Sequence, residues 1–265
     1  MPRPRSPLAT ILPPLGAYGA VRLAYALATG SRPLAFDTAT FARWYSGNYY
    51  DIAEKGYYWA SCASQNRPLH GDLCSPAAWY TGYPFLTRAV AQVTGLDAGT
   101  AMVVVAHAAF LALLVAVWVG LLDGGRRDPG ADADTGTAGP GGAGHRERRW
   151  RRGRGRDATL FVLTAFFPGG VYLLAGFPLS LLSFLLTVQV ACFLRGRWWL
   201  GAGFGALASV CYPITAVLPL GSALWVLLAD TGTPGARRAR RAAGVAAVVL
   251  SGTLAVFALH QVTLD

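Results

Sequence analysis

Residues 158–194 form a run of 37 residues without a single charged side chain. As one α-helix this run would be about 55 Å long, because each residue adds about 1.5 Å, whereas the hydrocarbon core of a bilayer is about 30 Å thick. The run therefore predicts two membrane spans, 158–176 and 178–194, joined by a tight turn near Phe177. A chain with such a run in its middle is expected to fold largely within a membrane.

Five further runs extend this prediction to an all-α polytopic membrane protein of about seven transmembrane helices in a single membrane domain. The runs are residues 8–30, 101–122, 198–211, 213–229 and 242–262. The composition agrees, because only 14% of the residues are charged and soluble domains average about 25%. The chain ends directly after the last predicted span, which fits a fragment or a shortened relative of a longer protein.

The net charge of +10 comes mainly from arginine clusters that lie between apolar runs. Nine basic residues lie between Arg126 and Arg156, four between Arg237 and Arg241, and a pair lies in the short turn after residue 194. Basic segments between spans are typical of cytoplasmic loops. They predict a multi-pass protein of the cell membrane with a cytoplasmic N-terminus, and they need no nucleic acid to explain them. Residues 123–157 are low-complexity and are predicted to form a disordered, basic cytoplasmic loop.

Residues 31–100 differ from the rest of the chain. They contain five basic residues, five acidic residues and most of the tyrosines, and no stretch is apolar enough to span a bilayer. This balance predicts a large extracytoplasmic loop with short interfacial helices near 38–55 and 84–95. Two cysteines of this loop, Cys62 and Cys74, can form a disulfide in an oxidising compartment or remain two free thiols.

The cysteines and histidines elsewhere in the chain suggest packing rather than chemistry. Cys192 and Cys211 lie in apolar runs and are predicted to be buried packing residues. His70 and His107 show no zinc-ligand spacing with each other or with the cysteines, so no metal site is predicted.

The segment from Arg43 to Tyr57 reads R-W-Y-S-G-N-Y-Y-D-I-A-E-K-G-Y. It resembles the first outer loop of the PIG-V-like mannosyltransferases of the GT-C superfamily, whose pattern is roughly R-W-D-x-x-H-Y-x-x-I-A-x-x-G-Y. Residues 79–86, W-Y-T-G-Y-P-F-L, look like the family's F-F-P-x-Y-P-L-L. Weaker similarities follow in the same order over residues 166–186 and 195–212. With one lysine among many arginines, typical of a GC-rich genome, the chain looks like a divergent actinobacterial member.

The resemblance implies a membrane glycosyltransferase. Such an enzyme would transfer mannose from a polyprenyl-phosphate-linked donor to an acceptor at the outer membrane face. Polyprenyl-phosphate mannose would be its donor substrate, no bound cofactor is implied, and dependence on a divalent metal stays open. The expected partners are the lipid bilayer and the lipid-linked sugar donor.

Four positions depart from the family pattern. Tyr45 stands where the family has aspartate, Asn48 where it has histidine, Leu179 where it has glutamate, and Tyr212 where it has arginine. These departures favour a second hypothesis, a catalytically inactive GT-C-like membrane subunit or scaffold that binds another membrane protein. A transporter or channel is a third hypothesis, but the spans carry too few polar residues for an obvious ion path and no inverted repeat is seen.

Glycosyl transfer needs a carboxylate base for the acceptor and a positive group for the leaving phosphate. Asp51 is the candidate base, although Lys55, four residues later, offers an exposed ion pair as the alternative. Arg43 is the candidate phosphate contact, with interfacial anchoring as the alternative. We expect Asp37 to cap a helix. The candidate substrate-binding residues are Trp44, Tyr45, Asn48, Tyr49, Tyr80, Tyr83 and Arg88.

Overall fold

The computed structural model describes residues 7–32, 36–42, 45–61, 73–123, 158–167 and 170–264. These residues are almost entirely helical, which confirms the predicted all-α class. The exception is one short antiparallel ladder, in which β1 (Ala60–Ser61) pairs with β2 (Leu73–Cys74). The chain forms two compact units, residues 1–34 with 111–170 and residues 35–110 with 171–265.

Among the described residues, three helices are long and apolar enough to cross a membrane, and they lie where three spans were predicted. The helices are α1 (Pro7–Thr29), α5 (Ala98–Val115) with its π-helical continuation η3 (Ala116–Asp123), and α11 (Gly235–Leu264). Their apolar spans cover Thr10–Thr29, Ala98–Leu121 and Gly235–Thr263. They give the chain the character of a helical membrane protein.

Three of the four remaining predicted spans coincide with shorter helices. These are α8 (Leu179–Phe193), α9 (Trp198–Ser209) and α10 (Leu218–Ala229), the last preceded by the 3-10 helix η6 (Pro213–Val217). Helices of 12 to 15 residues extend only about 18 to 22 Å. The span predicted over 158–176 is interrupted, because one helix covers residues 158–165 and a second, α7, covers Val171–Leu174.

In the first unit, α1 packs against η3. The rings of Trp118 and Phe161 meet edge to face, with centroids 5.1 Å apart, and join η3 to the helix over residues 158–165. Arg22, the basic residue inside the first predicted span, is only 6% exposed.

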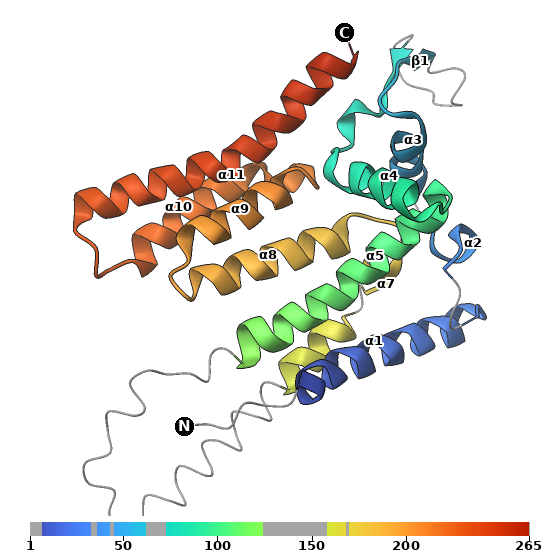
Figure 1. The fold of residues 1–265 in the computed structure, drawn as a ribbon, viewed down its shortest axis with the longest axis horizontal. Coiled ribbons are helices and arrows are strands. Elements are labelled where there is room, and N and C mark those ends of the chain that lie inside the picture. The colour runs from blue at the N-terminus through green and yellow to red at the C-terminus, as the bar shows by residue number, and fades with distance from the viewer. Residues whose placement is uncertain are drawn as a thin grey trace, which may run out of the picture. The chain divides into compact units, whose positions relative to one another are not determined.

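In the second unit, α8 packs against α9, and both α9 and α10 pack against α11 (Figure 1). Glycines set the close approach of α9 and α11. A Cβ atom at Gly252 would overlap the carbonyl oxygen of Ala206, and one at Gly205 would lie 2.9 Å from Val249. Small residues at helix contacts are typical of membrane bundles, where close backbone packing replaces the hydrophobic effect as the main attraction.

A buried polar pair adds to this packing. Gln189 Nε2 of α8 donates a hydrogen bond to Ser222 Oγ of α10 at 2.8 Å. Both side chains are 3% exposed. The predicted burial of Cys192 and Cys211 is also confirmed.

The described part of the 31–100 loop forms a layer of short helices, α2 (Thr38–Phe41), α3 (Ser46–Lys55), η2 (Pro76–Ala78) and α4 (Gly82–Thr94). We call α2, α3 and α4 the loop layer. The helix predicted near 84–95 is confirmed as α4. The helix predicted over 38–55 is instead two helices, because the backbone at Ala42 is extended (φ −75°, ψ 115°). Asp37 caps α2 as expected, since its carboxylate accepts the Thr40 N–H at 2.8 Å.

Backbone hydrogen bonds join the loop layer to the helix bundle of the second unit. The Gly82 N–H, at the start of α4, donates to the carbonyl of Val210 just after α9, at 2.7 Å. The Gly176 N–H, before α8, donates to the carbonyl of Phe41 in α2 at 3.0 Å. The end of α9 and the start of α8 therefore both meet this layer.

Side chains join two more helix ends to the same layer. The Tyr83 hydroxyl of α4 donates to the carbonyl of Met102 near the start of α5, at 2.7 Å. The ring of Tyr57, just after α3, contacts the ring of His260 near the end of α11, with centroids 4.5 Å apart. Four bundle helices thus present one end each to the loop layer.

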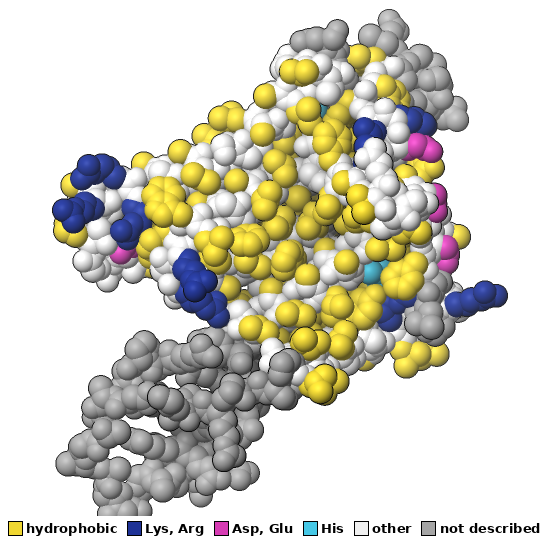
Figure 2. Space-filling view, in the orientation of Figure 1, with side chains coloured by type: hydrophobic (Ala, Val, Ile, Leu, Met, Phe, Trp, Pro, Cys, Tyr) yellow, Lys and Arg dark blue, Asp and Glu magenta, His cyan; other side chains and the backbone are white. Residues whose placement is uncertain are grey.

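The opposite ends of α8, α9 and α11 carry arginines. Arg195 and Arg197 lie in the turn between α8 and α9, and four arginines lie in the first two turns of α11. Figure 2 shows dark-blue side chains gathered where these turns lie. We call this the basic end. Because α11 begins at Gly235 rather than near residue 242 as predicted, its arginines belong to the helix and not to a loop.

Candidate functional site

A buried group of aromatic rings connects the segments on which the family resemblance rests. Tyr49 of α3 makes edge-to-face contacts with Trp79, Tyr83 and Phe177, with centroid distances of 5.3, 5.7 and 5.5 Å. Tyr49 and Tyr83 are fully buried. We call these four residues, with Met102 and the side chains packed on them, the aromatic cluster. Segments more than 120 residues apart in the sequence therefore meet at one place.

Three of the four positions that depart from the family pattern border this cluster. The ring of Tyr45 lies over Trp79 with centroids 5.0 Å apart. Leu179 and Tyr212 both pack against the cluster from the bundle side. Asn48, the fourth position, is half-buried in α3, one residue before Tyr49. The positions where the family has polar residues are thus gathered in space, although they are scattered along the chain.

The buried tyrosine hydroxyls in the cluster and beside it are neutral hydrogen-bonding groups. Burial raises the pKa of Tyr49 far above its usual value, and the neighbouring Tyr212 adds to the effect. Burial likewise raises the pKa of Tyr57, whose hydroxyl donates to the carbonyl of Trp79 at 2.5 Å. The Tyr49 hydroxyl is buried without a hydrogen-bond partner among the described residues. The cluster can therefore donate hydrogen bonds, but it supplies no charge.

Arg88, a predicted substrate-binding residue, is engaged inside the loop layer. Its Nε donates to the carbonyl of Ala53 at 2.7 Å, and its Nη2 donates to the carbonyl of Ile52 at 3.0 Å. Both carbonyls belong to the last turn of α3, and the Ile52 carbonyl also accepts the N–H of the capping residue Gly56 at 2.9 Å. The guanidinium also lies 5.8 Å from the ring of Phe85. Arg88 therefore holds α4 to the end of α3.

The carboxylates of α3 are also engaged. Asp51, the candidate base, accepts a hydrogen bond from Lys55 at 3.1 Å, which is the alternative expected from their spacing. This pairing raises the pKa of Lys55. Glu54 accepts a hydrogen bond from the Tyr50 hydroxyl at 3.1 Å. Arg43 and Trp44, the other residues expected beside Asp51, lie outside the described residues, as does Cys62 of the expected disulfide.

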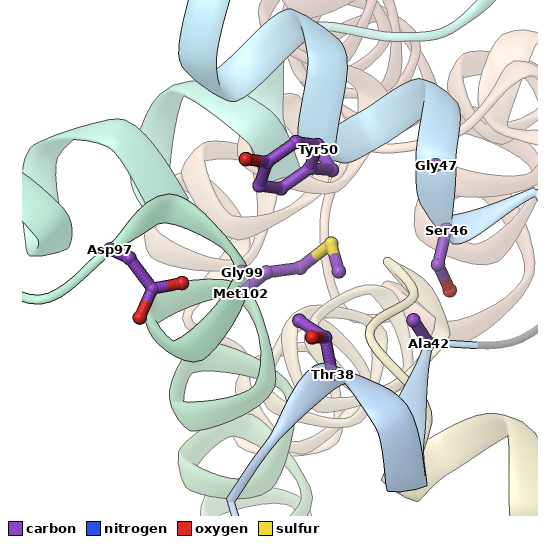
Figure 3. A pocket seen from close by; sticks show the side chains of 8 residues that line it. All are labelled: Thr38, Ala42, Ser46, Gly47, Tyr50, Asp97, Gly99 and Met102. Atoms are coloured by element: carbon purple, nitrogen blue, oxygen red, sulfur yellow. The ribbon is translucent and has the colours of Figure 1, made fainter.

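Beside the aromatic cluster lies an open cavity of about 270 Å³ (Figure 3). It is lined by Thr38, Ala42, Ser46, Gly47, Tyr50, Asp97, Gly99 and Met102. In Figure 3 the Met102 side chain extends between the Asp97 carboxylate on one side and the Ser46 hydroxyl on the other. Met102 also belongs to the aromatic cluster. The cavity therefore combines an apolar floor with a carboxylate and hydroxyl groups at its rim.

Asp97 lines the cavity, although it is not among the site residues predicted from the sequence. Its carboxylate accepts the Thr100 N–H at 2.9 Å and so caps α5. Hydrogen bonds from Thr100 hold the pKa of Asp97 below its usual value of 3.8, so the carboxylate is ionised at neutral pH. The signal in the sequence was an aspartate three residues before a threonine at the start of an apolar run, which indicates a cap and says nothing of a cavity.

The other predicted site residues that the structure describes do not line the cavity. Tyr49 and Tyr83 lie in the aromatic cluster, and Tyr80 is buried outside it, with 8% of its surface exposed. Among the described residues, no group of three or more histidine, cysteine, aspartate or glutamate side chains is placed to hold a metal ion. The polar groups that line the cavity are the Asp97 carboxylate and the hydroxyls of Thr38, Ser46 and Tyr50. They suit a ligand with several hydroxyls, because carboxylates and hydroxyls both accept hydrogen bonds from ligand hydroxyls.

Comparisons with known proteins add no assignment. No protein-family model matches the chain, no curated protein matches it, and no solved structure matches it.

Proposed function

We propose that this chain is a GT-C-like membrane glycosyltransferase that transfers mannose from a polyprenyl-phosphate-linked donor to an acceptor at the outer membrane face. The observation that supports the proposal is that the segments that resemble the family lie together in the structure. Tyr49, Trp79 and Phe177 come from three separate matches to the family, and Tyr49 contacts both of the other rings in the aromatic cluster. A chance resemblance spread over the chain would not be expected to converge beside a cavity.

The proposal includes an orientation and a number of crossings. We place the basic end in the cytoplasm, because arginines are enriched in cytoplasmic segments, and the loop layer outside. The shorter helices α8, α9 and α10 then cross between the two faces, which gives about seven spans with a cytoplasmic N-terminus. A reporter inserted at Gly232 should read as cytoplasmic and one at Gly71 as external. The reverse result would overturn this orientation.

The chemistry requires a carboxylate at the outer face. The acceptor hydroxyl attacks the anomeric carbon of mannose, its proton passes to the carboxylate, and the bond from that carbon to the lipid phosphate oxygen breaks. Asp97 borders the cavity and is ionised at neutral pH, so it joins Asp51 as a candidate base. Arg43, at the family's arginine position, would stabilise the departing phosphate.

Transfer of labelled mannose from polyprenyl-phosphate mannose, measured in membranes that contain the protein, tests the proposal. Loss of a general base typically lowers the rate by about 100-fold or more. We therefore expect that loss for Asp97→Asn or for Asp51→Asn, and little change for the control Glu54→Gln. Absence of transfer to any lipid or protein acceptor, with the protein folded, would rule the enzyme out.

One set of observations favours a second function, an inactive GT-C-like subunit that supports a membrane protein partner. Three family polar positions carry Tyr45, Leu179 and Tyr212, and these pack on the aromatic cluster. Both carboxylates of α3 are also held by neighbours. This function predicts no transfer, together with a partner that stays bound at fixed stoichiometry through detergent purification.

A further inference from the structure

We propose that the basic end binds the phosphate head group of an anionic phospholipid at a site built from Arg197, Arg237 and Arg240 around Trp199. The site lies at the end of the bundle away from the loop layer, and it does not depend on the proposed glycosyl transfer. Its parts come from two segments, the start of α9 and the first turns of α11.

The contact between Trp199 and α11 brings the two segments together. A Cβ atom at Gly244 would lie 2.7 Å from the Trp199 ring, so this ring rests directly on the α11 backbone. Below it, Phe193, Trp198, Ala242 and Val245 belong to one buried cluster that joins the ends of α8 and α9 to α11. The relative position of α9 and α11 is therefore fixed by close packing at this end.

The periodicity of α11 then shows on which face of the helix its arginines lie. Arg240 and Arg237 precede Gly244 by four and seven residues, and residues at these spacings share one face of a helix. Both therefore lie on the face of α11 that meets Trp199. Arg197 caps the start of α9, two residues before Trp199. The three arginines thus lie on the two helix segments that meet at the exposed Trp199 ring.

Two of the neighbouring arginines already have partners within the chain, and Arg238 is half-buried. Arg195 Nη1 donates to the carbonyl of Ala191 at 2.8 Å, and Arg241 Nη1 donates to Asp230 at 2.5 Å. In contrast, the guanidinium groups of Arg197, Arg237 and Arg240 have no hydrogen-bond or ion-pair partner in the part of the chain that the structure describes, and all three residues are exposed. Their donors are free for a phosphate, which a guanidinium can bind through two parallel hydrogen bonds.

The apolar surroundings identify the ligand as a lipid. Leu194, Trp199 and Leu200 are 61%, 58% and 50% exposed beside the arginines. A soluble anion would gain nothing from them, whereas a phospholipid would place its acyl chains on the apolar side chains and its phosphate among the arginines. Tryptophan is also enriched at the membrane interface, where head groups lie. Anionic lipids attract such basic segments, and each arginine near the surface adds to the attraction.

The test measures the thermal stability of the purified protein in neutral detergent as phosphatidylglycerol or phosphatidylcholine is added. We expect phosphatidylglycerol to raise the unfolding temperature and phosphatidylcholine to do so far less. In the variant Arg197→Gln/Arg240→Gln, half-saturation should need about 30-fold more phosphatidylglycerol, from the usual contribution of two basic residues. The variant Arg32→Gln/Lys55→Gln loses the same charge elsewhere and should behave as wild type.

A third variant keeps the test decisive if the glutamine variant folds poorly. Arg197→Lys/Arg240→Lys retains both charges and should keep most of the stabilisation. Equal half-saturation for the wild type and the glutamine variant would overturn the site. So would equal stabilisation by phosphatidylcholine. Inorganic phosphate that matched the effect of phosphatidylglycerol would show an anion site without lipid and would likewise overturn the proposal.

Discussion

Replacing Arg88 by methionine should loosen the end of α3 without unfolding the helix bundle. Methionine keeps an apolar side chain of similar length but removes the two hydrogen bonds to the carbonyls of Ile52 and Ala53. A hydrogen bond from a charged donor contributes about 1.5–3 kcal/mol when buried. Because Arg88 is only partly buried, we expect the two bonds together to contribute about 2 kcal/mol, toward the lower end of that range.

Hydrogen exchange measured by mass spectrometry on peptides from α3 (Ser46–Lys55) gives the local readout. A loss of about 2 kcal/mol corresponds to an exchange rate about 30-fold faster wherever local opening controls exchange. Arg88→Lys, with a single ammonium in place of the planar guanidinium, should show an intermediate rate. Gln92→Met, at an exposed position one turn later in α4, is the matched control and should leave α3 unchanged.

Two results would refute this reasoning in different ways. Unchanged exchange in Arg88→Met would mean that the bonds to α3 do not stabilise it. Lost glycosyl transfer with unchanged exchange would mean that Arg88 contacts substrate, as its sequence position first suggested. Faster exchange in α3 with intact transfer would support the structural role alone.

Three further predictions concern the bundle and the cavity. Gly252→Val should destabilise the protein by about 1–3 kcal/mol in thermal unfolding, because its Cβ overlaps α9, whereas Gly221→Val, which faces open space, should not. Gln189→Leu should cost about 0.6 kcal/mol, the usual value for an interhelical hydrogen bond in a membrane protein, and a double-mutant cycle with Ser222→Ala should recover that coupling. The pKa of Asp97 is lowered in the folded state. Its carboxylate therefore stabilises the start of α5 fully above about pH 4, and this stabilisation is lost as the pH falls through the folded-state pKa. Hydrogen exchange at the start of α5 should show this loss in the wild type and not in Asp97→Asn.

The helices could be predicted well from the sequence because apolar length is a local property. The charge-free runs gave the ends of α8 and α9 to within about two residues. The sequence predicts the start of α11 too late, because arginines before residue 242 are typical of a loop between spans. Arginine and alanine are both strong helix formers, so the helix continues through them to Gly235.

The loop layer was less predictable because contacts across the sequence determine it. The break between α2 and α3 depends on the cap at Asp37 and on the carbonyl of Phe41, which Gly176 reaches from 135 residues away. The partners of Arg88 are backbone carbonyls 35 and 36 residues earlier. A pattern can indicate a basic residue near the interface, but it does not show which groups that residue will meet.

Substitutions at two of the positions that depart from the family pattern, 179 and 212, are expected to have coupled effects on stability, because both side chains share one environment. Leu179 and Tyr212 pack against the aromatic cluster and also against the neighbouring cluster of Leu182 and Cys211. Restoring the family's glutamate alone, as Leu179→Glu, would place a charge among apolar side chains, and an unpaired charge in such a place costs about 3 kcal/mol or more.

Restoring the arginine as well, as Tyr212→Arg, would supply a partner for that charge. We therefore expect the double variant to be more stable than the sum of the two single losses predicts, by about 1–3 kcal/mol in a double-mutant cycle of thermal unfolding. The control pair Leu179→Gln with Tyr212→Gln carries no charges and should show little coupling. Additive losses in the charged pair would mean that the two positions do not face each other, and the shared polar site inferred from the resemblance would lose its structural basis.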